Sequence, residues 1–272
     1  MYEIFFGLSR KPFSASPDPS MYVASPAAER TMKRLTYAVR ENIGGFLLTG
    51  PSGCGKTLLL EKLAITGAAN LEFLFVRAGR MDGDALAAAL LRAAGLVVDG
   101  AAGRPFDRNT AMHNFDKYLL GKAGGGQRFA VIIDGAEWVD NDGLTVLEML
   151  NDIRRDGAFL ATFVLSGRES MARRVVSLPG LRDRFALSAK VEPLDAAGCS
   201  GYVTGRLTAA GGRREIFNKE ALAQVFLFSK GVPRRVNRVA DLALLTAFGL
   251  ERETVGAEVM EAVIEELAQG PV

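Results

Sequence analysis

The chain has 272 residues, of which 49% are hydrophobic and 24% charged, and its formal net charge is +2. Such values are typical of a soluble globular protein with room for one large α/β domain and a smaller one, and they argue against a strongly basic nucleic-acid binder. No apolar run approaches the ~20 residues of a membrane-spanning helix, and the amino terminus lacks the pattern of a leader peptide. The sequence therefore predicts a cytoplasmic protein.

Cysteine and histidine are scarce. The two cysteines, Cys54 and Cys199, lie far apart in the sequence, and His113 is the only histidine. A disulfide framework, a metal cluster and a histidine-based catalytic triad are therefore not indicated.

Residues 1–25 are rich in aromatic residues and proline, which predicts an extended, turn-like segment. Residues 26–40 follow as a predicted helix, with Ser25 as its cap and proline at its first position.

Residues 50–57 read Gly-Pro-Ser-Gly-Cys-Gly-Lys-Thr and match the phosphate-binding pattern G-x-x-x-x-G-K-[ST]. An apolar strand at 46–48 leads in and a helix at 58–64 leads out, which is the context that the pattern requires. Lys56 is expected to reach the β- and γ-phosphates of ATP, and the Thr57 hydroxyl to bind Mg²⁺. The alternative is a glycine-rich turn with a chance Gly-Lys-Thr. The predicted nucleotide contacts here are Gly50, Pro51, Ser52, Gly53, Cys54, Gly55, Lys56, Thr57 and Leu58.

The next elements are a strand at 73–76, a helix at 82–94, a loop at 95–105 and a helix at 108–120. A third strand, residues 129–134, is continuously apolar until it ends in an acid. Strands of this kind end at the carboxyl edge of an open α/β sheet, where ligands bind.

Asp134 ends this strand in the manner of a Walker B acid and is expected to hold Mg²⁺ through water. Gly135 occupies the position of the usual catalytic glutamate, and Glu137 follows two residues later. Either Glu137 takes over as the base that polarises the attacking water, or hydrolysis is slow and the protein is a nucleotide switch. A helix-cap carboxylate is the structural alternative for Glu137.

A helix at 143–155 and a strand at 159–165 come next, and Ser166 follows as a candidate γ-phosphate sensor or an ordinary turn residue. A short strand is predicted at 185–191. Arg184, and after it Arg182, could supply an arginine finger to a neighbouring subunit's nucleotide. The alternative is a surface ion pair with Asp183.

The sequence changes character at residues 192–195. An amino-terminal α/β nucleotide-binding domain is predicted over 1–192 and an all-helical lid over 193–272, with lid helices at 196–210, 219–228, 233–248 and 254–268. Arg234 lies in the first turn of the third lid helix, where a basic residue is unfavourable without a specific partner. It is expected to contact the nucleotide phosphates from the lid.

Several motifs together resemble one family. They are Phe-Phe-Gly-Leu with Pro-Phe and Pro-Asp-Pro, the phosphate loop, the Walker B strand, Glu-Pro-Leu, and Gly-Val-Pro-Arg-Arg-Val-Asn. The chain resembles AAA+ ATPases of the general secretion pathway protein A (ExeA) type over nearly its whole length. The resemblance implies a five-stranded parallel α/β core, a helical lid and ATP-driven rings. It makes Pro12 and Phe13 candidate adenine contacts, unless they are an aromatic turn packed on the core.

Two departures from the family pattern stand out. Relatives commonly read Asp-Glu-Ala-Gln where this chain reads Asp-Gly-Ala-Glu, so fast hydrolysis is not implied. Secretion-pathway members usually continue into a membrane helix and a cell-wall-binding domain, which this sequence does not include.

Three functions are compatible with the resemblance. The first is an ATPase that uses ATP/ADP and Mg²⁺, forms a homo-oligomeric ring or helical filament, and assembles an envelope secretion, pilus or polysaccharide export system. The second is a TniB/TnsC-like transposition ATPase on duplex DNA. Arg77, Arg80 and the basic lid are candidate DNA contacts. The alternatives are ordinary exposed loop charges for Arg77 and Arg80, which we favour, and head-to-tail subunit contacts for the lid. The third is a slow STAND-like nucleotide switch.

Overall fold

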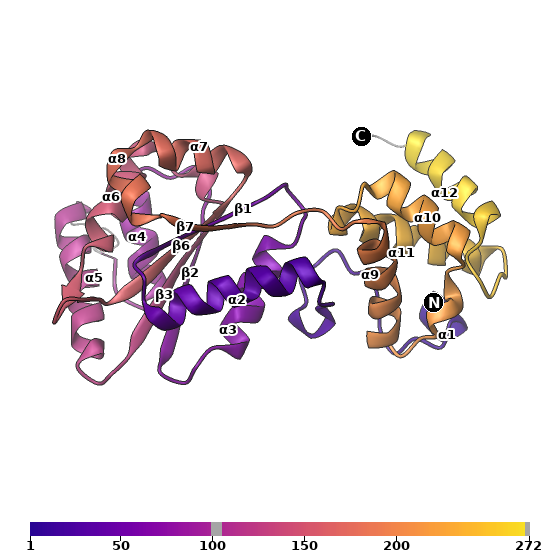
Figure 1. Ribbon diagram of the computed structural model, residues 1–272, viewed down its shortest axis with the longest axis horizontal. Coiled ribbons are helices and arrows are strands. Elements are labelled where there is room, and N and C mark those ends of the chain that lie inside the picture. The colour runs from indigo at the N-terminus through magenta and orange to yellow at the C-terminus, as the bar shows by residue number, and fades with distance from the viewer. Residues whose placement is uncertain (99–104, 270–272) are drawn as a thin grey trace. The chain divides into compact units, whose positions relative to one another are not determined.

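Five strands form one parallel sheet (Figure 1). The computed structural model describes residues 1–98 and 105–269. The sheet order is β2-β3-β6-β1-β7, and the strands are β1 (Gly45–Thr49), β2 (Leu71–Arg77), β3 (Arg128–Asp134), β6 (Ala161–Gly167) and β7 (Leu187–Lys190). The predicted five-stranded parallel sheet is thereby confirmed.

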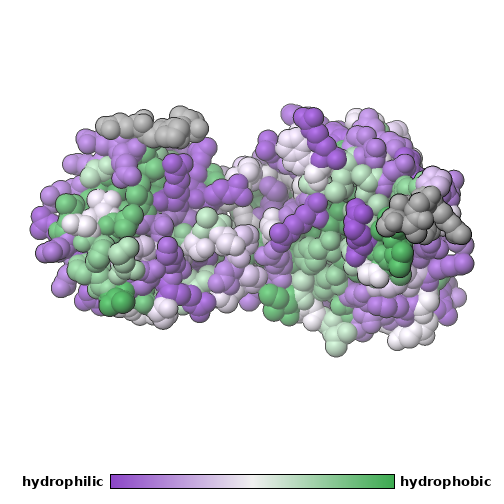
Figure 2. All heavy atoms as spheres, turned by 180° about the vertical axis from the view of Figure 1, so that it is seen from behind, coloured by the Kyte–Doolittle hydropathy of each residue, from purple (hydrophilic) through white to green (hydrophobic). Residues whose placement is uncertain are grey.

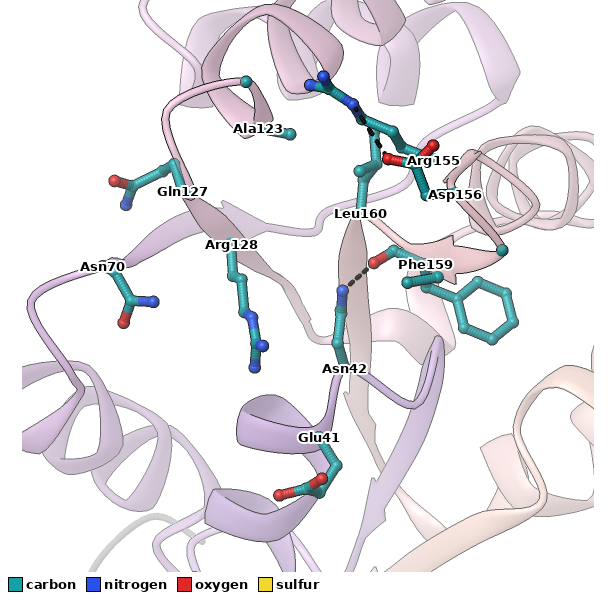
Figure 3. Close-up of a pocket in the computed structure, with 14 residues that line it drawn as sticks. Glu41, Asn42, Asn70, Ala123, Gln127, Arg128, Arg155, Asp156, Phe159 and Leu160 are labelled. Atoms are coloured by element: carbon teal, nitrogen blue, oxygen red, sulfur yellow. Dashed lines mark hydrogen bonds and ion pairs between the residues drawn. The ribbon is translucent and has the colours of Figure 1, made fainter.

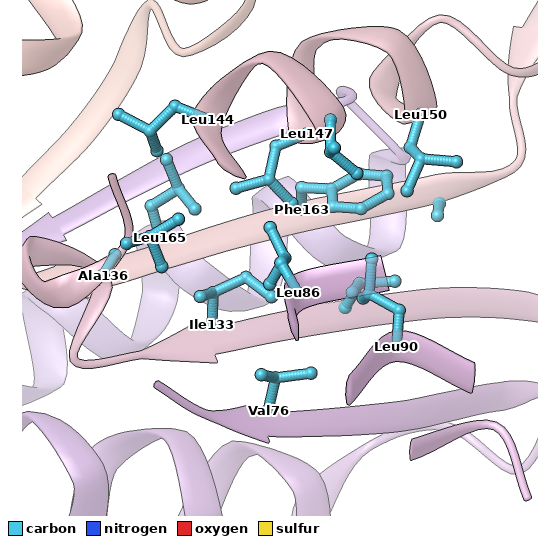
Figure 4. Close-up of a cluster of buried hydrophobic side chains, with 14 of the residues drawn as sticks. Val76, Leu86, Leu90, Ile133, Ala136, Leu144, Leu147, Leu150, Phe163 and Leu165 are labelled. Atoms are coloured by element: carbon cyan, nitrogen blue, oxygen red, sulfur yellow. The ribbon is translucent and has the colours of Figure 1, made fainter. Parts of the chain in front are cut away.

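The central strands β1, β3 and β6 are buried on both faces, which explains why they read as nearly continuous apolar runs. Alternate residues such as Val131, Ile133 and Phe163 join one core cluster with the helices that follow β2, β3 and β6 (Figure 4). These helices are α4 (Gly83–Ala93), α5 (Arg108–Ala123), α6 (Asn141–Asn151), α7 (Glu169–Ser177) and α8 (Pro179–Arg184). The buried Thr162 instead donates its hydroxyl to the carbonyl of Ala38 in α2 (Pro26–Glu41), at 3.2 Å, and so points to the opposite face.

The chain divides by its contacts into two compact units. One contains Arg30–Gly50 and Leu60–Val191, which is the sheet with its helices; the other contains Met1–Glu29, Pro51–Leu59 and Glu192–Val272. The second boundary lies where the sequence changes character. The amino-terminal segment, which the sequence groups with the α/β domain, has its contacts in the helical unit.

The helical unit is built from α9 (Ala196–Ala209), α10 (Lys219–Ser229), α11 (Pro233–Gly249) and α12 (Ala257–Gln269). Asp195 caps α9 by accepting from the amide of Gly198, and Asn218 caps α10 by accepting from that of Ala221. Their apolar faces enclose a separate core centred on residues such as Val203, Val239 and Leu244. The predicted all-helical part is confirmed, although its last helix begins at Ala257 rather than 254; its role as a lid stays a prediction.

The expected helix over 143–155 is wrong at both ends. Asp140 caps α6, which therefore begins two residues earlier, and the helix ends at Asn151. The chain then forms a hairpin from β4 (Arg154–Arg155) and β5 (Ala158–Phe159). Asp156 and Gly157 both have positive φ, 53° and 80°, as a tight hairpin turn requires.

Two helices between β6 and β7 were not expected from the sequence. α7 and α8 occupy the segment after Ser166, and β7 begins at Leu187, so the strand predicted at 185–191 is shorter. Pro179 opens α8 and Phe185 follows it with a buried ring. Such short helices are stabilised by packing more than by their own sequence.

The amino-terminal segment is partly helical, which corrects the extended conformation expected for 1–25. α1 (Tyr2–Phe5) and the 3₁₀ turn η1 (Pro19–Met21) lie within it. The Tyr2 side chain is buried and its hydroxyl donates to Asp241 of α11. Burial and the Asp241 carboxylate raise the pKa of Tyr2 far above its ordinary value.

A buried arginine fastens the rest of this segment. The Arg206 side chain is 2% exposed, and its guanidinium donates to the carbonyls of Pro12 at 2.6 Å and Met21 at 3.1 Å.

We expect Arg206→Met to destabilise the helical unit by about 2–4 kcal/mol, because it leaves two buried carbonyls without donors. Urea unfolding measures this loss, and limited proteolysis should cleave the freed segment. Arg213→Met is the control: Arg213 is exposed and its ion pair with Glu253 spans 4.0 Å, so a loss as large there would contradict the explanation.

Part of the predicted loop at 95–105 lies outside the described residues, since 99–104 are not described. Among the helices in the described ranges, none combines the length and apolarity that crossing a membrane requires. Figure 2 shows that hydrophilic residues cover much of one face of the molecule, with apolar residues in smaller groups between them.

Candidate nucleotide-binding site

The predicted phosphate loop connects β1 to α3 (Lys56–Thr66). Gly53 and Gly55 have φ of 82° and 93°, conformations that side-chain-bearing residues rarely adopt. A Cβ on Gly50 would lie 2.3 Å from the carbonyl oxygen of Val191, so only glycine fits where the loop leaves the sheet. The loop therefore has the backbone that an anion cradle at a helix N-terminus needs.

Lys56 and Thr57 begin α3, at the end of the helix whose dipole favours anions. The Lys56 ammonium donates to the carbonyl of Pro51 at 3.0 Å, within the loop itself. This contact holds the ammonium over the loop. A cation and a hydroxyl at a helix N-terminus are the groups expected for phosphate and for Mg²⁺, so these residues fit a nucleotide with its metal.

Arg234 lies beside the same loop. Its backbone amide donates to the carbonyl of Gly53 at 3.1 Å, and a Cβ on Gly53 would lie 2.8 Å from the Cβ of Arg234. The first turn of α11 thus packs on the phosphate loop. Gly231 shapes the approach: its φ is 69°, and a Cβ there would lie 1.8 Å from the carbonyl oxygen of Leu194. The phosphate contact predicted for Arg234 stays a prediction.

Asp134 and Ser166 meet at the carboxyl edge of the sheet, where β3 and β6 pair in register. The Ser166 hydroxyl is fully buried and donates to Oδ1 of Asp134 at 2.7 Å. The amide of Gly135 donates to the Ser166 carbonyl at 2.9 Å. The candidate sensor is therefore bound directly to the candidate metal-binding carboxylate.

Gly135, which stands where a glutamate is usual, has a backbone conformation that disfavours any side chain. Its φ is 83°, and a Cβ there would lie 3.0 Å from the carbonyl oxygen of Ala78. This left-handed residue turns the chain into the short helix η2 (Ala136–Trp138), which contains Glu137. The turn brings the Glu137 carboxylate back to the edge: a Cβ on Gly167, the residue after Ser166, would lie 2.9 Å from its Oε2.

The Glu137 carboxylate has one paired and one unpaired oxygen. Oε1 lies 3.3 Å from Nε of Arg168, and the Glu137 side chain is 16% exposed. Oε2 is buried and has no hydrogen-bond partner among the described residues. A buried carboxylate oxygen needs a donor, and a water molecule held for attack on phosphate would be one.

Arg168 and Arg174 were not singled out from the sequence. Arg168 also lies over the Trp138 ring, with its guanidinium carbon 5.9 Å from the ring centroid. Arg174 of α7 donates to the carbonyls of Val139 at 2.7 Å and Glu137 at 3.3 Å, which fixes the η2 turn. The sequence signal that could have identified Arg168 as a site residue is its position directly after Ser166-Gly167, at the end of a buried strand.

The candidate finger residues have partners within their own domain. Arg184 donates to Asp152, to Glu148 at 3.4 Å and to the Gly180 carbonyl at 2.6 Å, and the bond to Asp152 raises the pKa of Arg184. Arg182 pairs with Asp183 at 3.1 Å and is mostly exposed. Action in trans stays a prediction for both, and for Arg184 it requires breaking these bonds.

Pro12 and Phe13 are both buried in the helical unit. The Phe13 ring lies edge-on to Phe217, with 6.2 Å between centroids. The aromatic turn therefore packs on the helical core, which is one of the two interpretations that the sequence allowed. Adenine contact by these residues stays a prediction.

The sequence profile of the AAA domain family matches residues 39–175, which include β1, the phosphate loop, Asp134 and Ser166. This chain belongs to the AAA family. Within it, the chain is similar to general secretion pathway protein A of Aeromonas hydrophila, with 30% identity over 254 residues. The match covers 91% of this chain and 45% of the relative, so the AAA chain spans less than half the length of that protein.

Solved structures support the same fold. Cdc6p from Pyrobaculum aerophilum matches with a TM-score of 0.74 at 16% identity, over 95% of this chain and 71% of that one. The ORC1 protein of Aeropyrum pernix, solved in complex with DNA, matches with a TM-score of 0.69 at 18% identity, over 95% and 69%. At these identities the likeness establishes the AAA+ fold. Family membership supports nucleotide binding and hydrolysis in general.

Proposed function

We propose that this AAA domain binds ATP with Mg²⁺ and hydrolyses it slowly, with Glu137 as the base. The observation that carries the proposal is the buried, unpaired Oε2 of Glu137 beside Gly167, next to the Ser166–Asp134 pair. A carboxylate in that setting is suited to orient and deprotonate an attacking water. Gly135 stands where the catalytic glutamate is usual, and we assign the role of the base to Glu137 in the following turn.

Each side chain has a proposed task. The loop amides and the Lys56 ammonium bind the phosphates, Thr57 and Asp134 hold Mg²⁺, the latter through water, and Arg234 contacts phosphate from the start of α11. When bound, Mg²⁺ would draw charge from the phosphate oxygens. Ser166 orients Asp134 through their 2.7 Å hydrogen bond and senses the γ-phosphate.

Assembly is the proposed output. We propose that ATP drives the chain into a homo-oligomeric ring or helical filament, with Arg184 or Arg182 completing a neighbour's site, and that this assembly serves a cell-envelope secretion, pilus or polysaccharide export system. The similarity to general secretion pathway protein A supports that class of partner. Because ATP is a cytoplasmic substrate, the domain is expected to act there.

Duplex DNA is the second candidate partner. One structural neighbour was solved in complex with DNA, and the lid carries exposed cations such as Arg213 and Lys219. A slow nucleotide switch of the STAND type is the third candidate, supported by Gly135.

Steady-state ATP hydrolysis tests these alternatives. We expect a rate per subunit that rises with protein concentration, because a finger in trans acts only after assembly. Salt-sensitive stimulation by duplex DNA would favour the second candidate, since phosphate contacts weaken as salt rises. A rate independent of both concentration and DNA would contradict assembly-linked hydrolysis and favour the slow switch.

A further inference from the structure

The exposed side of α2 carries four cations and two acids, Glu29 and Glu41. Arg30, Lys33, Arg34 and Arg40 are exposed there, with Tyr37 between them at 58% exposure; we call these five residues the α2 stripe. The opposite face of the helix is buried through Thr31, Leu35, Ala38 and Val39. At a rise of ~1.5 Å per residue, the stripe extends along about 15 Å of helix.

Among the described residues, none of the four cations of the stripe has an anionic partner, which is also true of isolated arginines such as Arg92 and Arg173, but in the stripe four such cations lie on one helix. Arg77 pairs with Glu61 and Arg108 with Asp142, whereas no described carboxylate forms an ion pair with any of the four cations of the stripe. Like charges three and four residues apart on a helix destabilise it by roughly 0.2–0.5 kcal/mol per pair. Glu29 and Glu41 offset two of these four charges, and the remaining positive excess is one that a polyanionic ligand would neutralise.

A hollow adjoins the carboxyl end of the stripe (Figure 3). It has a volume of about 760 Å³, and its polar lining includes Asn42, Asn70, Gln127, Arg128 and Arg155. Arg128 is linked to the stripe, because its guanidinium donates to the backbone carbonyl of Arg40. The hollow therefore continues the basic surface and adds amide groups that can hydrogen-bond.

The β4–β5 hairpin forms the far wall of the hollow. Asn42 donates to the carbonyl of Phe159, which ties the hairpin to the end of α2. The guanidinium of Arg154 lies 4.2 Å from the centroid of the Phe159 ring. Two acids, Glu41 and Asp156, also line the hollow, so cations outnumber anions across the combined surface.

We propose that the α2 stripe and this hollow bind the phosphate backbone of duplex DNA. A row of unpaired cations matches a duplex, which presents one negative charge per ~1.7 Å of its axis. Protein interfaces are less suitable occupants, because their centres are depleted of charge and built around apolar anchors. Single strands require stacking platforms, and among the described residues of this surface only the Tyr37 ring is both exposed and uncovered by another side chain.

This inference deepens the second candidate function but needs no nucleotide, since all of its residues belong to the sheet unit and none is a proposed nucleotide contact, whereas Lys56 and Thr57 belong to the other unit. DNA binding is therefore measured without ATP and repeated with Lys56→Ala. Loss of ATP binding with unchanged DNA binding would leave the inference intact, so the two proposals can fail separately.

The test is fluorescence anisotropy of a labelled 30-base-pair duplex at several salt concentrations. The variant carries Arg30→Glu, Lys33→Glu and Arg34→Glu. The matched control carries Arg92→Glu, Lys117→Glu and Arg173→Glu, which are exposed, have no ion pair among the described residues and change the net charge equally. The stripe variant should lose at least about 10-fold in affinity at low salt. The steepness of the decrease of log K with log salt should be smaller by about 3, because three phosphate contacts are lost.

A milder variant guards against misfolding. Lys33→Gln with Arg34→Gln introduces no acid. It should reduce the steepness of the decrease of log K with log salt by about 2. Equal losses in the stripe and control variants would overturn the proposal, as would a wild-type chain that does not bind DNA at 50 mM salt. Lost self-association with unchanged DNA binding would assign the stripe to a contact between copies of the chain and overturn it too.

Discussion

Lys56→Ala is expected to weaken ATP binding by more than 100-fold and to reduce hydrolysis to background. The ammonium lies over the phosphate loop through its 3.0 Å bond to the Pro51 carbonyl, and it is positioned to neutralise phosphate charge. Isothermal titration with ATP and Mg²⁺ measures the loss. The midpoint of thermal unfolding without nucleotide should be nearly unchanged, because the Lys56 side chain is not among the buried residues of the core.

Lys62→Ala is the matched control, since Lys62 lies on the same helix beyond the loop. It should bind ATP as the wild type does. Similar losses in both variants would indicate a general effect of charge on α3 and would contradict a specific role for Lys56.

Glu137→Gln is expected to leave ATP affinity within about threefold and to lower the hydrolysis rate by about 100-fold or more. Glutamine has the size of glutamate but is no base, and general-base catalysis by a positioned side chain is typically worth ~10²–10⁴ in rate. Single-turnover hydrolysis separates the chemical step from nucleotide binding. Sedimentation should find the variant trapped in its ATP-bound assembly.

Glu169→Gln provides the comparison for that variant. Glu169 begins α7 near the same strand end, is half exposed, and pairs with Lys190 at 2.9 Å. It should hydrolyse ATP at close to the wild-type rate. If Glu137→Gln also kept the wild-type rate, the base would have to be another group and the proposed mechanism would be wrong.

The centre of the sheet could be predicted because β1, β3 and β6 are buried on both faces and so carry nearly continuous apolar runs. The helices with a capping residue and a long periodic pattern, such as α4 and α10, were predicted to within one residue. The hairpin after α6 was missed although its Asp156-Gly157 turn was visible, because the apolar stripe of the preceding helix seemed to continue through Ile153. α7 and α8 are too short for periodicity to identify them against their neighbours.

The sequence by itself determined the phosphate loop, the acid at the end of β3 and the division into a sheet and a helical part, because each depends on neighbouring residues in a fixed local pattern. Only the tertiary structure decided that Glu137 lies against Gly167, that Arg184 is bound to Asp152, and that Phe13 packs in the helical core. Those outcomes depend on contacts between residues 30 to more than 200 positions apart, which follow from packing and from where each backbone turn directs the chain.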